Sequence, residues 1–145
     1  MARTASDIVI DASPSAVMAV IADFEAYPEW ATGMRSAEVL QTSADGRAER
    51  VRFTLDAPPI RDTYELRYTW DGDRSVTWDL AEKATVLTAM DGTYRLDPRG
   101  DATQVTYQLS VGVVLPLLGT LKRKAEKVII DTALSGLKQR VENVG

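Results

Sequence analysis

Few side chains in this sequence could do chemistry, because its 145 residues include no Cys and no His. Without them the chain cannot build a thiolate nucleophile, an imidazole-based triad, a Cys/His zinc site or a disulfide framework. The sequence has no Asp-rich loop with the spacing of an oxygen-ligated Ca²⁺ or Mg²⁺ site, so we expect no metal and no other cofactor. Any chemistry must use Asp, Glu, Lys, Arg, Tyr, Ser or Thr, or the reactivity of the ligand itself.

Only a few charged residues remain as acid–base candidates. Asp91, Arg95 and the Arg61-Asp62 pair could supply such groups if they reached a ligand. The alternation along their strand, however, places Asp91 and Arg95 on the opposite face from its apolar residues. We therefore interpret all four as surface charge pairs and assign no catalytic residue.

Aromatic residues give the clearest indication of a binding site. Tyr64 and Tyr107 could hydrogen-bond a carbonyl and favour an enolate, as an aldol-type cyclisation requires. Trp30 is a candidate either for the rim of a pocket or for a local plug between two short helices. The predicted aromatic face could form the wall of a pocket for a flat or lipidic ligand, or it could be ordinary core. Its members are Phe53, Tyr64, Tyr68, Trp70, Trp78 and Tyr107.

The size and charge of the chain limit its class. A length of 145 residues and a mass of 15.9 kDa suit one globular domain, residues 1–145, which needs no disulfide or metal for stability. With 17 Lys+Arg against 21 Asp+Glu the formal charge is −4, whereas a general nucleic-acid binder has a basic surface. Residues 1–10 contain no long apolar segment, so we expect neither a signal peptide nor a membrane span and place the protein in the cytoplasm.

A period of two dominates the middle of the chain, from Met34 to Val113. Apolar residues alternate there with polar ones, as in antiparallel strands with one covered face, and turn signals separate the runs. The stretch from Met34 to Gln41 is less regular, because Val39 and Leu40 are adjacent. Three hairpins can be aligned so that their apolar residues share one face, with Leu55 opposite Tyr64, Trp70 opposite Val76 and Leu96 opposite Val105.

The amino-terminal part of the chain predicts a strand and two short helices. The strand covers Thr4 to Asp11. Ser13 then suits a helix cap and Pro14 the first helical position, and an apolar stripe at helical spacing follows. Pro28 disfavours a helical conformation at Tyr27, so we expect the first helix to break there, with a second short helix or turn around the break.

Helical spacing returns from Pro116 to Asn143. A helix of this length is roughly 40 Å long, enough to cross a small sheet and cover its apolar face. The apolar run from Val111 to Leu121 is too short to span a bilayer, but with the basic residues from Lys122 to Lys127 it could contact a membrane surface. Charge pairs at i,i+4 and the net negative charge favour an ordinary solvated helix face instead.

Several motifs resemble a known family. The amino-terminal segments Ile8-Val-Ile-Asp-Ala-Ser-Pro-Ser-Ala-Val17, Val20-Ile-Ala-Asp23 and Tyr27-Pro-Glu-Trp30 resemble the opening of the START-related, helix-grip (SRPBCC) superfamily. The most similar branch is that of the bacterial polyketide cyclase/dehydrase proteins, which includes relatives of ubiquinone-binding mitochondrial proteins. Gly92-Thr-Tyr-Arg-Leu96 and Leu121-Lys-Arg-Lys-Ala125 resemble its actinobacterial members. The resemblance covers essentially the whole chain.

This resemblance and the residue pattern together imply an α+β helix-grip (START-like) fold. We expect a curved sheet of seven antiparallel strands around a long C-terminal helix, with two short N-terminal helices. The resemblance further implies a deep hydrophobic cavity under the C-terminal helix. Its expected lining consists of Trp30, Phe53, Tyr64, Leu66, Tyr68, Trp78, Met90, Tyr107, Leu121, Ala125 and Val128.

Three functions stay open at this point. The leading hypothesis is binding, with or without transport, of a small hydrophobic ligand such as a lipid, quinone or polyketide, without turnover. The alternative is a polyketide cyclase, aromatase or dehydratase, whose cavity orients a flexible poly-ketone so that the substrate's own reactivity does most of the work. A third class is a non-enzymatic interaction module. We expect a small hydrophobic molecule as partner, no nucleic acid and no stable membrane insertion, and the sequence does not decide the oligomeric state.

Overall fold

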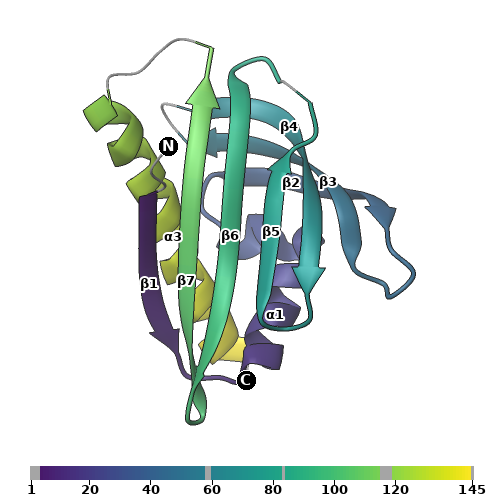
Figure 1. The fold of residues 1–145 in the computed structure, drawn as a ribbon, viewed down its shortest axis with the longest axis vertical. Helices are drawn as coiled ribbons and strands as arrows, with labels where there is room; N and C mark the ends of the chain where they lie inside the picture. Colours follow the sequence, from purple (N-terminus) through teal and green to yellow (C-terminus); the bar gives the residue numbers. More distant parts are fainter. Residues whose placement is uncertain (1–3, 58–59, 83, 115–118, 145) are drawn as a thin grey trace.

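The computed structural model describes residues 4–57, 60–82, 84–114 and 119–144, and they form the expected α+β helix-grip fold. One sheet of seven antiparallel strands has the order β1-β7-β6-β5-β4-β3-β2 (Figure 1). The strands are β1 (Thr4–Ile10), β2 (Met34–Thr42), β3 (Ala48–Ala57), β4 (Ile60–Asp71), β5 (Ser75–Leu80), β6 (Leu87–Arg99) and β7 (Ala102–Val113). The helices are α1 (Pro14–Ala22), the short 3-10 helix η1 (Phe24–Ala26), α2 (Tyr27–Trp30) and α3 (Gly119–Val144).

The start of α1 is as expected, but its end is not. The Ser13 hydroxyl accepts a hydrogen bond from the amide of Ala16 at 3.3 Å, and Pro14 is the first helical residue. The chain leaves the helix at Asp23 (φ −87°, ψ 73°) rather than at Tyr27. The prediction that Tyr27 is extended is therefore wrong: it has φ −52° and ψ −42° and opens α2, with Pro28 in the first turn, where its missing N–H costs nothing.

Two of the three expected hairpin registers are confirmed. Trp70 lies opposite Val76 in β4–β5, and Leu96 lies opposite Val105 in β6–β7. Strand β2 is irregular where the sequence suggested it. Its pairing with β3 shifts beside Leu40, whose side chain is 38% exposed. Because neighbouring residues of a strand point to opposite faces, Leu40 lies on the exposed face while the adjacent Val39 is partly covered.

The register expected for β3 and β4 is wrong by two residues. Leu55 lies opposite Asp62 instead of Tyr64, and Phe53 takes the place opposite Tyr64. The strands run further toward their connection than the turn signal suggested, since Ala57 still pairs with Ile60. A slip of two residues keeps every side chain on its own face, so the alternation could not distinguish the two registers.

Helix α3 covers the apolar face of the sheet, packing against β1 and β7 (Figure 1). A buried carboxylate fixes it there: Glu126 accepts a hydrogen bond from the Thr4 hydroxyl at 2.6 Å and from the amide of Val111 at 2.7 Å. The helix ends at Val144, one residue beyond the expected Asn143. Its expected start at Pro116 lies outside the described residues. No helix in the described part of the chain is long and apolar enough to cross a membrane.

Candidate ligand-binding cavity

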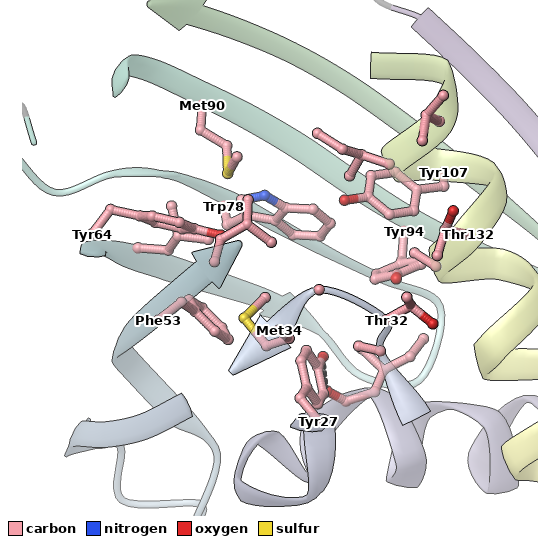
Figure 2. Close-up of a pocket in the computed structure, with 18 of the residues that line it drawn as sticks. Tyr27, Thr32, Met34, Phe53, Tyr64, Trp78, Met90, Tyr94, Tyr107 and Thr132 are labelled. Carbon is pink, nitrogen blue, oxygen red and sulfur yellow. Dashed lines mark hydrogen bonds between the residues drawn. The ribbon is translucent and has the colours of Figure 1, made fainter. Parts of the chain in front are cut away.

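A cavity of about 290 Å³ lies between the concave face of the sheet, the α2–β2 connection and α3. Its wall is mainly apolar and aromatic, and its volume is near the lower end of the roughly 300–1,000 Å³ typical of ligand pockets. It forms because the inward residues of β3 to β7 and one side of α3 do not meet across the middle of the sheet. Figure 2 shows side chains from both walls pointing into this space.

Most of the residues expected at the site line this cavity. Nine of them come together from the strands β3 to β7 and from α3: Phe53, Tyr64, Leu66, Tyr68, Trp78, Met90, Tyr107, Ala125 and Val128. Trp30 does not line it; its ring lies against Tyr27 at a centroid distance of 4.9 Å, and its backbone lies against Gly136 of α3. The side chain of Leu121 lies outside the described part of the chain.

Twelve lining residues were not anticipated. Two signals could have found some of them: Leu55 and Tyr94 continue the strand alternation, and the α3 residues follow Ala125 and Val128 at helical spacing. The segment from Ala31 to Gly33 carries no such signal, because it is the connection between α2 and β2. The full set is Ile21, Tyr27, Ala31, Thr32, Gly33, Met34, Leu55, Asp56, Tyr94, Ile129, Thr132 and Ala133.

Tyrosine hydroxyls are the main polar groups inside the cavity. Tyr64 and Tyr107 point their hydroxyls toward each other from opposite sides (Figure 2). Neither hydroxyl makes a hydrogen bond with any residue that the structure describes, and the same holds for Tyr68 and Tyr94. Burial raises the pKa of all four phenols, so they stay neutral at physiological pH and can donate a hydrogen bond to a ligand.

Tyr27 differs from the other tyrosines of the cavity because its hydroxyl is already engaged. It donates a hydrogen bond of 2.5 Å to the carbonyl of Ile21 in the last turn of α1. Burial also raises the pKa of this phenol well above its ordinary value. Tyr27 therefore holds α1 and α2 together and contributes mainly its ring to the cavity wall.

The indole of Trp78 lies between the two facing phenols, and a glycine permits that position (Figure 2). Trp78 on β5 pairs with Gly92 on β6. A Cβ on Gly92 would lie only 2.3 Å from two carbons of the indole, so any larger residue there would displace the ring. Gly92 thus lets the indole lie flat over β6, where it shapes the cavity.

One charged residue lies in the described wall of the cavity. Asp56 is the single charged residue among the described lining residues, and its amide is bonded to the carbonyl of Gly33 at 2.8 Å. The guanidinium of Arg35 bonds one carboxylate oxygen, and that of Arg61 lies 2.7 Å from the other. The hydrogen bond from Arg35 lowers the pKa of Asp56, with Arg61 acting in the same direction, so the carboxylate is ionised at neutral pH.

The other acid–base candidates do not reach the cavity. Asp91 and Arg95 are absent from its lining. Asp62 instead accepts hydrogen bonds from the amides of Val86 and Leu87, at 2.7 and 2.9 Å, and so holds the start of β6 beside β4. Among the described residues no three acidic side chains gather to hold a metal ion.

Comparison with known proteins places this geometry in a family. Residues 1–142 match the family described as "Polyketide cyclase / dehydrase and lipid transport". No curated protein sequence matches the chain. Its structure is similar to a START superfamily protein from Mycobacterium smegmatis, with a TM-score of 0.91, 22% identity and 99% of each chain covered.

Two further solved structures share the architecture. One is the Zhui aromatase/cyclase from Streptomyces sp. R1128, with a TM-score of 0.81, 16% identity, and 98% of this chain and 94% of that chain covered. The other is the protein TTHA0849 from Thermus thermophilus, with a TM-score of 0.82, 21% identity and 99% of each chain covered. The match over nearly its whole length shows that the chain belongs to the polyketide cyclase/dehydrase and lipid-transport family, with the START-like helix-grip fold.

Proposed function

We propose that the chain binds a small hydrophobic ligand, such as a lipid, quinone or polyketide, between its sheet and α3, without turnover. The observation that carries this proposal is the aromatic cavity, in which four tyrosine hydroxyls lack a hydrogen-bond partner among the described residues. Hydroxyls that line an apolar cavity without a protein partner favour a ligand or water with acceptor atoms in that cavity. An apolar wall with a few polar groups is the usual form of such a site. We expect the protein to act in the cytoplasm.

The charged groups support binding rather than turnover. The only charged lining residue described, Asp56, forms ion pairs with two arginines, and the phenols inside have raised pKa values. None of these groups can exchange a proton readily at neutral pH. The family's description includes lipid transport, which needs binding alone.

Fluorescence of phenylnaphthylamine, a neutral hydrophobic dye, tests this proposal. Ala133 lines the cavity from α3, so Ala133→Leu should place extra carbon atoms in it and lower dye affinity about tenfold, while unfolding stability is kept or raised. Ala19, exposed on α1, provides the matched control, since Ala19→Leu adds the same atoms far from the cavity. No dye binding by the wild type, or equal binding by the two variants, contradicts the proposal.

A second candidate is cyclisation or dehydration of a poly-ketone. The hydroxyls of Tyr64 and Tyr107 favour it, because each can donate a hydrogen bond to a carbonyl oxygen of the poly-ketone and so stabilise an enolate. The Zhui protein of similar structure is an aromatase/cyclase. On this hypothesis Tyr64→Phe or Tyr107→Phe slows the formation of a product lighter by one water, while dye binding is retained. Unchanged product formation in both variants counts against it.

A further inference from the structure

The three tryptophans of the chain differ in what their indole N–H groups contact. The Nε1 of Trp70 donates a hydrogen bond to the carbonyl of Ala48 at 2.7 Å. The Nε1 of Trp30 is buried without a partner among the described residues, and Trp30 does not line the cavity. Trp78 does line it, and its Nε1 makes no hydrogen bond with any residue that the structure describes. Of the three, Trp78 is therefore the one whose N–H a ligand in the cavity could reach.

The indole of Trp78 is held firmly in the wall of the cavity. Its side chain belongs to a residue that is only 5% exposed, and the rings of Tyr68, Tyr94 and Tyr107 surround it (Figure 2). Its Nε1 lies close over Gly92, since a Cβ there would be 2.6 Å away. An N–H that is fixed in an apolar wall without a protein partner favours an acceptor atom supplied from the cavity.

The chemistry of the wall restricts what this acceptor can be. An indole N–H only donates, whereas the tyrosine and threonine hydroxyls nearby can donate or accept. The described lining contains no cation, so an anionic acceptor would be buried without a counter-charge, which is costly. The one carboxylate of the lining, Asp56, already forms ion pairs with Arg35 and Arg61. A neutral group that only accepts, such as a carbonyl oxygen, suits Trp78 best.

We propose that Trp78 is a specificity-determining residue, whose indole N–H donates a hydrogen bond to a neutral carbonyl oxygen of the ligand. This inference rests on the function proposed above and narrows its ligand to a ketone or quinone. A hydrocarbon of the same shape leaves the N–H unpaired, and an alcohol brings a donor that needs an acceptor of its own. A cavity of about 290 Å³ suits a small ligand of this kind, such as two fused rings.

Nuclear magnetic resonance of the wild-type protein tests the contact directly. Isotope labelling of the indole nitrogens gives one N–H signal for each tryptophan, and the variants Trp78→Phe and Trp70→Phe assign them. Saturating α-tetralone should move the Trp78 proton signal downfield, because a hydrogen bond to a carbonyl deshields the proton. Tetralin, which has the same two rings without the carbonyl, should not produce this downfield shift. The Trp70 signal should stay in place with both compounds, since its N–H is already bonded to Ala48.

Displacement of phenylnaphthylamine measures what the contact contributes to affinity. Trp78→Phe should weaken α-tetralone relative to tetralin by about three- to tenfold, the effect of losing one neutral hydrogen bond. The space that the smaller ring leaves affects both compounds alike, so their ratio isolates the N–H. Trp70→Phe is the matched control, because it removes an indole N–H that does not line the cavity and should leave the ratio unchanged.

The outcomes separate this inference from the proposed function. The inference is wrong, and the proposed function stands, if the dye binds but α-tetralone does not displace it or does not shift the Trp78 signal more than tetralin does. The same holds if Trp78→Phe leaves the ratio unchanged or changes it no more than Trp70→Phe does. If α-tetralol depends on Trp78 as strongly as α-tetralone, a carbonyl is not selected and the inference also fails. If the dye does not bind, both fail.

Discussion

Replacing Gly92 by alanine tests how the cavity is shaped. The new Cβ would lie 2.3 Å from the Cε2 and Cζ2 atoms of Trp78 and 2.6 Å from its Nε1. Carbon atoms in contact are normally about 3.5–4.0 Å apart, so the indole must move by more than about 1 Å. The rings of Tyr68, Tyr94 and Tyr107 surround it at centroid distances of 5.8, 5.4 and 5.6 Å. Displacement of the indole toward these rings reduces the volume of the cavity.

The cost of Gly92→Ala follows from two opposing effects. Overpacking of this size destabilises a core by about 1–3 kcal/mol. Removing a glycine from a strand stabilises it by about 0.5–1 kcal/mol, because the unfolded chain loses freedom. We therefore expect a net loss of about 0.5–2 kcal/mol in the free energy of unfolding, together with weaker binding of phenylnaphthylamine.

A double-mutant cycle with Trp78→Phe isolates the clash. The smaller ring lacks the atoms nearest the new Cβ, so Gly92→Ala in the Trp78→Phe background should be neutral or stabilising. Urea unfolding followed by circular dichroism measures all four proteins without relying on tryptophan fluorescence. A coupling of about 1–3 kcal/mol is expected. If Gly92→Ala costs the same in both backgrounds, the close approach of Gly92 to Trp78 does not shape the cavity, and the reasoning is refuted.

Three other measurements test the packing. All five tyrosines of the chain have a pKa raised chiefly by burial, so above about pH 10 only the unfolded chain loses phenol protons. The free energy of unfolding should fall there by up to about 7 kcal/mol per pH unit; tyrosinate absorbance in the folded protein at that pH would contradict this. Tyr27→Phe, which removes the bond to Ile21, should cost about 1–2 kcal/mol in urea unfolding, and an unchanged midpoint would show that this bond contributes nothing. Glu126→Ala should cost about 2–3 kcal/mol because it leaves the amide of Val111 without its acceptor, and Glu126→Gln, which keeps a carbonyl oxygen, should cost less; equal losses would contradict this account.

Local patterns account for the parts of the fold that the sequence predicted well. The alternation of Val51, Phe53 and Leu55 places these residues on the covered face in either register, because side chains in a strand repeat every two residues. Ser13 and Pro14 locate the start of α1, because a cap and a first-turn proline act within a few residues. The same reasoning failed at Tyr27, where burial of its ring and the hydroxyl bond to Ile21 stabilise a helical conformation before proline.

The candidate site was predictable only where strand or helix periodicity extends into it. Alternation placed Tyr64 and Trp78 on the cavity wall, and helical spacing placed Val128 there. The connection that carries Thr32 and Gly33 has no periodicity, so its contribution depends on how α2 packs against β2. Contacts between elements that are distant in the sequence cannot be predicted from local composition.

The sequence by itself determined the fold class of this chain: an α+β fold with a one-sided sheet, a long final helix and no Cys or His for nucleophilic or zinc chemistry. Only the tertiary structure decided which charged residues pair, because Asp56 meets Arg61 through a β3–β4 register that differs from the expected one by two residues. The tertiary structure also decided that a cavity forms. Glu126 holds α3 against β1 and β7, and the inward side chains of the other strands do not reach α3. Alternation fixes which face a residue occupies, whereas register and the distance between layers depend on the packing of the whole chain.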